Sequence, residues 1–311
     1  MAARAEAGPC AACGAENAAD HNFCKNCGNP LGTEQGGELN LNFAERMRDR
    51  CLETLKTNPD NARAHFDLGL AYYHLGQTGN AARAFERCLQ LEDAYPAAHF
   101  QLALCHYRRG AMAECANAAR KAIELNPSSA PAHFRLAIAL FHQARLDEAA
   151  RAFERCLQLE DAYPAAHFQL ALCHYRRGAM AECAKAARKA IELNPSSAPA
   201  HFRLAIALFH QARLDEAAHA FEHTITVDPE YVIAWYHLGV IRERQKNVEN
   251  AIACFEKVVD ANPDDASAHY HLGLCYEHHG KDGLAISALA RALELDPSDT
   301  AAAAALQELQ R

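Results

Sequence analysis

Four cysteines near the start of the chain have a spacing that suits a metal ion. Cys10, Cys13, Cys24 and Cys27 form the pattern C-x2-C-x10-C-x2-C, and a glycine follows each pair. Four thiolates can surround one tetrahedral ion, and they leave no open coordination position for a substrate. The pattern therefore predicts a structural Zn2+ site, with iron as the alternative because it accepts the same ligands. A thiol-exchange centre needs only one C-x-x-C, so two matched pairs favour the metal.

Residues 9–31 resemble the short prokaryotic zinc ribbon, and the resemblance implies a small four-cysteine β-hairpin module over residues 1–31. A core of about 25 residues cannot fold unaided, so metal binding would supply its folding energy. Zinc ribbons often touch nucleic acid. Residues 1–37, however, carry two basic residues against four acidic ones, which argues against a phosphate-binding surface. Residues 32–38 are rich in glycine and polar residues and predict a flexible linker.

A second candidate for chemistry is the stretch CHYRRGAMAEC, which occurs at 105–115 and again at 173–183. Two cysteines and a histidine this close could form a metal or redox site, or they could belong to a structural unit that was copied whole. Residues 81–148 reappear as 149–216 with one difference, Asn117 against Lys185. The offset of 68 is twice 34, which indicates a repeat protein. Whether the duplication is natural or engineered stays open.

The 34-residue period continues along the chain. The segment AHFQLALCHY at 98–107 corresponds to AHFRLAIALF at 132–141 and to AWYHLGVIRE at 234–243. This pattern of residues resembles the tetratricopeptide repeat (TPR), in which each unit is two antiparallel helices. Position 4 departs from the family pattern, because it is histidine in six units and tryptophan only at Trp235. The resemblance implies seven units over 62–299, starting at 62, 96, 130, 164, 198, 232 and 266.

The expected fold is all-α: a right-handed superhelical solenoid of seven helix pairs, behind the zinc ribbon. Apolar residues recur at 3–4 spacing, which predicts amphipathic helices that must stack on one another. We expect an N-terminal capping helix within 39–61 and a C-terminal capping helix within 300–311. Ser129 can cap a helix whose first turn holds Pro131. Gly110 and Gly178 suit the tight turn inside a unit.

The repeated cysteines and histidines fit structural roles in this frame. Cysteines stand at positions 10, 20 and 27 of a unit, where a small buried side chain is needed and a free thiol behaves as one. The histidines at position 4 fall one per repeat. Neighbouring helices pack about 8–10 Å apart, whereas zinc ligands lie about 2 Å from the ion, so two such histidines should not share a metal. The residues concerned are Cys88, Cys105, Cys115, Cys156, Cys173 and Cys183, and His65, His99, His133, His167, His201 and His269.

The TPR resemblance also implies a partner-binding groove, since the first helix of each unit lines a concave surface through positions 2, 5, 6, 9, 12 and 13. In the middle units positions 5 and 12 are aromatic, position 9 is aliphatic, and the polar places hold only cations or neutral side chains. Such a groove favours a peptide with apolar anchors and acidic flanks; the alternative is that these aromatics serve internal packing. The predicted groove residues are Phe100, Tyr107, Arg108, Phe134, Arg135, Phe141, Phe168, Tyr175, Arg176, Phe202, Arg203 and Phe209.

Composition supports a binding protein over an enzyme. The chain of 311 residues has a net charge of −8, which disfavours nucleic acid and anionic membranes as partners. Its 13 cysteines are mostly isolated, and no signal peptide or membrane-length apolar run is present, so we expect a cytoplasmic protein. Known catalytic motifs are absent from the sequence. The predicted function is a non-enzymatic protein–protein interaction scaffold. The alternatives are a self-assembling homo-oligomer and a zinc- or redox-linked regulatory adaptor.

Overall fold

The computed structural model describes residues 41–311, and this part of the chain contains sixteen α-helices and no strand. The prediction of an all-helical repeat fold is therefore confirmed. The predicted zinc ribbon, with Cys10, Cys13, Cys24 and Cys27, lies outside the described residues, as does the linker. The helices form two compact units that divide between Gln169 and Leu170, inside one helix. Each unit is described by itself below.

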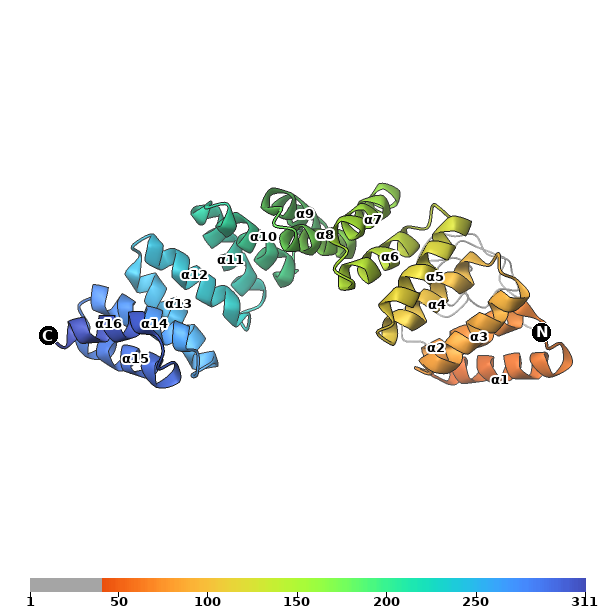
Figure 1. Ribbon diagram of the computed structural model, residues 1–311, viewed down its shortest axis with the longest axis horizontal. Coiled ribbons are helices and arrows are strands. Elements are labelled where there is room, and N and C mark those ends of the chain that lie inside the picture. The colour runs from red at the N-terminus through yellow and green to blue at the C-terminus, as the bar shows by residue number, and fades with distance from the viewer. Residues whose placement is uncertain (1–40) are drawn as a thin grey trace. The chain divides into compact units, whose positions relative to one another are not determined.

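The first unit begins with a single helix and continues as helical hairpins (Figure 1). Short turns join the helices, and helices begin at residues 62, 96, 130 and 164, four of the expected unit starts. The helices are α1 (Leu41–Thr57), α2 (Ala62–His74), α3 (Thr78–Leu91), α4 (Pro96–Arg108), α5 (Met112–Leu125), α6 (Ala130–His142), α7 (Leu146–Leu159) and α8 (Pro164–Arg176), in which the division falls.

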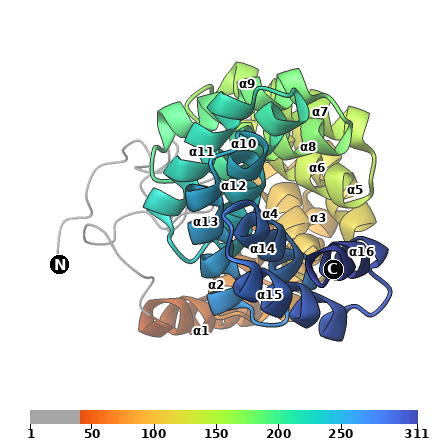
Figure 2. The same cartoon turned by 90° about the vertical axis from the view of Figure 1, so that its left-hand side faces the viewer.

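The second unit has the same construction and ends with a single helix. Figure 2 shows α12, α13, α14 and α15 packed in chain order. The helices are α9 (Met180–Leu193), α10 (Ala198–His210), α11 (Leu214–Val227), α12 (Val232–Arg244), α13 (Val248–Ala261), α14 (Ala266–His278), α15 (Asp282–Leu295) and α16 (Thr300–Leu309).

The turn inside each helix pair uses left-handed backbone at one repeat position. Gly110 and Gly178 have φ values of 75° and 76°, which confirms their predicted role. Alanine or lysine takes the same conformation in three other pairs, with φ between 58° and 60°. These residues adopt left-handed backbone, which is strained for a residue with a Cβ atom, because the turn must bring the second helix back against the first.

Helix starts are capped as the sequence predicts. The Ser129 hydroxyl accepts the N–H of Ala132 at 3.4 Å, and Pro131 occupies the first turn of α6. Ser197 does the same for Ala200 at 3.3 Å at the start of α10. These bonds satisfy backbone donors that have no partner within the helix.

Phenylalanines of the second helices form the centre of the packing. Phe85, Phe153, Phe221 and Phe255 are fully buried, at 0% exposure. Each of the first three contacts a phenylalanine on the first helix of its pair; the Phe134 and Phe153 rings, for example, have centroids 5.8 Å apart at 62°. Edge-to-face contacts of this kind add to the burial of apolar area. Small residues at positions 8 and 20 let the helices approach closely enough to make these contacts.

The histidines at position 4 connect each helix pair to the segment that precedes it. In all six, Nε2 lies 2.9–3.1 Å from the carbonyl oxygen six residues earlier, as between His133 and Pro127. Trp235 donates its indole N–H to the carbonyl of Pro229 at 3.0 Å in the same way. A carbonyl can only accept, so Nε2 of each histidine carries the proton. Position 4 thus requires a ring N–H donor, and histidine replaces the family's tryptophan without loss of this bond.

The repeated cysteines are free and buried, as predicted. Burial raises the pKa of Cys105 and Cys156 to about 12, and that of Cys115 and Cys183 to about 11. The nucleophile and metal ligand is the thiolate, which is scarce at neutral pH for thiols with these values. The stretch CHYRRGAMAEC is therefore part of the scaffold.

Candidate functional site

The first helices of each unit present a row of aromatic rings covered by arginines, which we call the first-helix face. It consists of repeat positions 2, 5, 6, 9, 12 and 13. In the first structural unit the Arg108 guanidinium lies 3.7 Å from the centroid of the Tyr73 ring. Arg135 lies 4.5 Å from the centroid of the Tyr107 ring. Each of these two rings stands at position 12 and is stacked by an arginine of the following helix pair.

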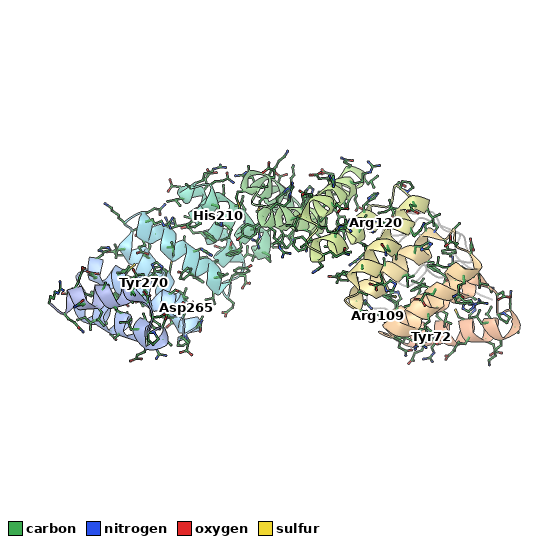
Figure 3. The ribbon with its side chains drawn as sticks, in the orientation of Figure 1. Tyr72, Arg109, Arg120, His210, Asp265 and Tyr270 are labelled. Atoms are coloured by element: carbon green, nitrogen blue, oxygen red, sulfur yellow. The ribbon has the colours of Figure 1, made fainter. Side chains whose placement is uncertain are left out.

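The second structural unit repeats this arrangement. Arg203 lies 4.4 Å from the Tyr175 ring centroid, and Arg244 lies 5.1 Å from that of Phe209. His210, at the end of α10 (Figure 3), lies beside the Tyr175 ring at a centroid distance of 6.1 Å and a tilt of 47°. The arginines come from position 13 or position 6, yet both positions place the guanidinium on the ring at position 12.

Two of these arginines have a donor, Nε, that no group in the described part of the chain accepts from. The Nε atoms of Arg135 and Arg203 are buried and have no hydrogen-bond partner among the described residues. No carboxylate lies within 4.0 Å of either guanidinium in residues 41–311. A stacked guanidinium uses its face on the ring, so its in-plane N–H groups remain available. A buried donor without a partner costs about 1–3 kcal/mol, and a ligand acceptor would recover this cost only if the side chain shifts to expose Nε.

The predicted groove residues divide by burial. Phe100 and Phe202 are 8% exposed and Phe141 is 7% exposed, so these rings belong to the helix packing. Phe134 and Phe168 are partly buried, and Phe134 packs on Phe153 and Tyr163. Tyr107, Tyr175 and Phe209 are partly buried. The arginines that lie over them are partly exposed or exposed, namely Arg135, Arg203 and Arg244. Arg108 and Arg176 are exposed.

Sequence reasoning missed two members of the row, Tyr73 and Arg244. Tyr73 belongs to the first repeat and Arg244 to the sixth, outside the middle repeats where the prediction concentrated. The signal was present, because they occupy repeat positions 12 and 13, where the middle repeats carry aromatics and arginines.

The first-helix face is less cationic in the outer repeats. Asp67 pairs with Arg63 at 3.1 Å in α2. In the second structural unit, Glu243 bonds Nδ1 of His271 at 2.9 Å, beside a cavity of about 610 Å³ between α12 and α14. Residues 96–209 hold no carboxylate at the face positions. The positive charge of the face therefore gathers on the middle repeats.

We expect His237 to make the second structural unit less stable in acid. Burial, and secondarily the neighbouring His210, lower the pKa of His237, whose ring stacks on Phe221 at 5.4 Å. The unfolded chain has the ordinary histidine pKa of about 6.5, so it binds more protons than the folded chain below that pH. The free energy of unfolding should then fall as the pH decreases from about 7 to about 5. We expect His237→Gln, which copies Gln101 and Gln169 at the same repeat position, to flatten this fall in urea titrations; an unchanged slope would contradict the assignment.

The described part of the chain offers neither a preassembled metal site nor a membrane span. Residues 41–311 contain no group of three or more His, Cys, Asp or Glu side chains arranged to hold an ion. Among the described helices, none is long and apolar enough to cross a membrane.

Stacked helical hairpins with a repeated row of aromatic and arginine side chains define a helical repeat protein. The comparisons name the repeat. A tetratricopeptide repeat sequence model matches residues 50–96, 202–259 and 247–300. A model of anaphase-promoting complex, cyclosome, subunit 3 matches residues 74–156 and 152–224. The chain is a TPR-type helical repeat protein, a type that generally mediates protein–protein interaction.

Solved structures support the same fold. YrrB, described as a TPR protein with an unusual peptide-binding site, has 23% identity and a TM-score of 0.56, over 60% of this chain and 96% of YrrB. The C-terminal part of a TPR repeat-containing protein from Cytophaga hutchinsonii has 12% identity and a TM-score of 0.63, over 86% of this chain and 99% of that one. PilF of Pseudomonas aeruginosa has 18% identity and a TM-score of 0.56, over 70% and 97%. No curated protein sequence matches this chain.

Proposed function

We propose that this protein is a non-enzymatic scaffold that binds an acidic, apolar-anchored peptide segment of a partner protein on its first-helix face. The observation that carries the proposal is the pair Arg135 and Arg203. Both are stacked on tyrosine rings, both have a buried Nε without a partner, and neither faces a carboxylate of this chain within the described residues.

The geometry suits a carboxylate ligand. A guanidinium held flat on a ring presents its edge in one direction, and a carboxylate can accept two parallel N–H bonds from that edge. The ring fixes the arginine before the ligand arrives, so less side-chain entropy is lost on binding. Apolar side chains of the ligand would contact the exposed parts of the rings and the partly buried leucines at position 9, Leu104 and Leu172.

Repetition would strengthen the interaction. Each structural unit holds two arginine–aromatic pairs, so a ligand with several acidic residues can engage more than one of them. The second contact is then intramolecular, and the affinity exceeds that of a single pair. YrrB, of similar fold, is described as having a peptide-binding site, which is consistent with a peptide ligand here. A cytoplasmic location would fit the buried free thiols.

The direct experiment is fluorescence anisotropy with two labelled peptides of equal length and hydrophobicity. One alternates leucine or phenylalanine with aspartate, and the other replaces every aspartate by lysine. We expect saturable binding of the acidic peptide, weakened by salt because the contacts are partly exposed, and none of the basic one. Equal binding of both peptides would reject the proposed charge selectivity.

We propose that the N-terminal cysteines form a structural zinc ribbon that is not needed for peptide binding. The support is the C-x2-C-x10-C-x2-C spacing alone. We expect Cys10→Ser plus Cys24→Ser to remove one zinc ion per chain, because a closed tetrahedral site does not survive the loss of two thiolates. Metal analysis after dialysis measures this loss. Unchanged zinc content would contradict the site, and iron in the wild-type protein would establish the alternative metal.

Peptide binding by the double cysteine variant separates a structural ribbon from a regulatory one. A scaffold with a structural ribbon binds the acidic peptide as the wild type does. Loss of peptide binding on zinc removal would instead establish the metal-linked regulator.

A further inference from the structure

We propose that His219 and His223, on the second-helix side of the second structural unit, bind a divalent transition-metal ion such as Zn2+. The two histidines are four residues apart in α11, so they lie one turn apart on the same face of the helix. Both are exposed, and the side chain of His219 is 76% accessible. This proposed site uses none of the N-terminal cysteines and none of the repeat positions of the first-helix face.

The two rings have a separation that fits one shared ion. Their centroids lie 5.0 Å apart and their planes meet at 84°. When the nitrogens of two imidazoles each lie about 2.0–2.1 Å from a zinc ion, the ring centroids are roughly 5 Å apart. The separation therefore allows both rings to coordinate once they rotate to turn their nitrogens toward a common point.

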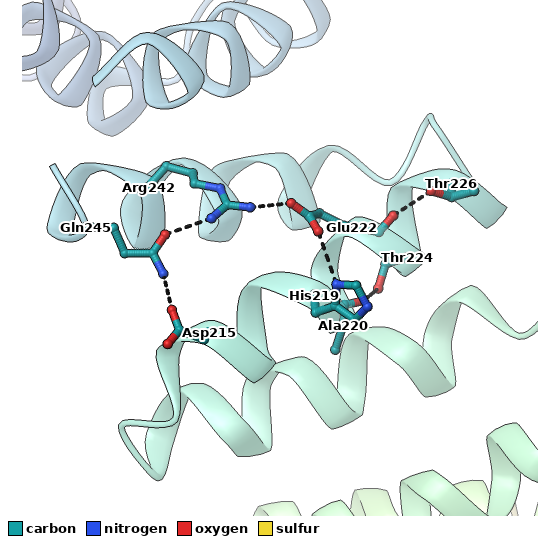
Figure 4. Close-up of polar contacts among 8 residues, drawn as sticks. All are labelled: Asp215, His219, Ala220, Glu222, Thr224, Thr226, Arg242 and Gln245. Carbon is teal, nitrogen blue, oxygen red and sulfur yellow. Dashed lines mark hydrogen bonds and ion pairs between the residues drawn. The ribbon is translucent and has the colours of Figure 1, made fainter. Parts of the chain in front are cut away.

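Neighbouring groups hold both rings in place. Nδ1 of His219 lies 3.5 Å from Oε2 of Glu222, and Glu222 is in turn held by Arg242 of α12 (Figure 4). A carboxylate at Nδ1 favours the tautomer with the proton on that nitrogen and leaves Nε2 free as a ligand, the usual support of metal-bound histidine. His223 stacks on His201 at a centroid distance of 5.4 Å.

The surroundings can complete the coordination. The histidines line a cavity of about 580 Å³ between α9, α10 and α11, which Glu192 and Glu216 also line. Glu216 pairs with Arg213 at 2.6 Å and lies 3.9 Å from Arg188, and Glu192 pairs with Lys189 at 2.6 Å, so either carboxylate would have to leave a cation to reach the ion. Residues 41–311 hold no preassembled group of three ligands. The ion would therefore take two imidazoles from the protein and its remaining ligands from water or from a carboxylate that turns toward it.

A helix at the corresponding place of an earlier repeat, identical to α11 at eight of fourteen positions, lacks the pair. Helix α7 reads LDEAARAFERCLQL and α11 reads LDEAAHAFEHTITV, so Arg151 and Arg155 stand where α11 has the two histidines. The helices α6 and α10, which pair with them, have the same sequence. The pair of changes places two neutral nitrogen ligands where the other copy has two cations, and arginine cannot serve as a ligand at neutral pH.

The internal copy supplies the control for the experiment. His219→Arg plus His223→Arg gives α11 the residues that α7 carries at these two positions, where arginine is already accommodated in a helix of this chain. Zinc bound per full-length chain is measured by equilibrium dialysis at micromolar free zinc, for the wild type and for this variant. Any ion held by the N-terminal cysteines is present in both proteins and cancels in the difference.

We expect the double variant to bind one zinc ion fewer than the wild type, and the single variant His219→Gln to bind zinc more weakly. Equal zinc content in wild type and double variant would overturn the proposal. The reciprocal variant, Arg151→His plus Arg155→His, is expected to gain zinc. If the double variant loses zinc but the reciprocal variant gains none, the site on α11 is still supported. The difference would then be assigned to Arg242, which holds Glu222, because the repeat after α7 has His174 at the position of Arg242.

Discussion

Replacing Arg135 and Arg203 by glutamate should lower the affinity for an acidic peptide at least about 100-fold. A hydrogen bond to a charged group contributes about 1.5–3 kcal/mol, and each tenfold change in affinity corresponds to about 1.4 kcal/mol. At each arginine, charge reversal removes the two N–H bonds of a bidentate contact with a carboxylate and adds repulsion between like charges. Both substitutions lie on the helix surface over tyrosine rings, so the helix packing should persist. Anisotropy with the acidic peptide measures the change.

The matched control is Arg83→Glu plus Arg151→Glu. It changes the net charge by the same amount, but on exposed positions of the second helices α3 and α7. We expect this control to retain nearly all of the affinity. If the two variants weaken binding equally, the ligand responds to the overall charge and the first-helix face is not its site. A pull-down from native extract with the same three proteins would show whether a natural partner follows the peptide.

Phe153→Ala should destabilise the fold more than any surface substitution, by about 3–5 kcal/mol in the free energy of unfolding. The ring is 0% exposed and packs edge-to-face on Phe134, so its loss leaves a cavity between α6 and α7. In a repeat protein each pair contacts only its neighbours, and the effect should spread to the adjoining pairs. Urea unfolding followed by far-ultraviolet circular dichroism measures the change.

Phe153→Leu is the control for this prediction, because Leu289 occupies the same repeat position in the last repeat and is also fully buried. Leucine fills most of the space, so we expect it to cost clearly less than alanine. If alanine and leucine have the same small effect, Phe153 does not anchor the hairpin as described.

The sequence alone was sufficient to predict the helical hairpins. The 34-residue period sets the length of each pair, Ser129 and Gly110 mark a helix start and a turn, and the apolar spacing determines which faces are buried. These are local signals, and each acts within a few residues. The burial of Cys105 follows from the same period, because its repeat position must be small.

It was harder to predict which residues of the first-helix face are exposed. Positions 5 and 12 are both aromatic and lie on one stripe, yet Phe100 at position 5 is buried while Tyr107 at position 12 reaches the surface. The difference depends on the depth at which the neighbouring second helix packs, which a periodic pattern does not contain. The stacking of Arg135 on Tyr107 is a contact between successive repeats, and residues so far apart in the chain give no local signal.

Position 4 gives a further example. The histidines there looked like departures from the family pattern and like candidate ligands. Their shared bond to a carbonyl oxygen six residues earlier, as in His133, shows that the pattern concerns a ring N–H and not a tryptophan. The sequence contained both residue types at this position, but only the structure shows the acceptor.

The most direct test of the central claim is selection from a random peptide display library on the full-length protein. The wild type should enrich peptides that combine aspartate or glutamate with leucine or aromatic residues, and Arg135→Glu plus Arg203→Glu should lose this enrichment while Arg83→Glu plus Arg151→Glu keeps it. Peptides without an acidic preference, or the same acidic peptides on all three proteins, would contradict the assignment of the first-helix face as the binding site.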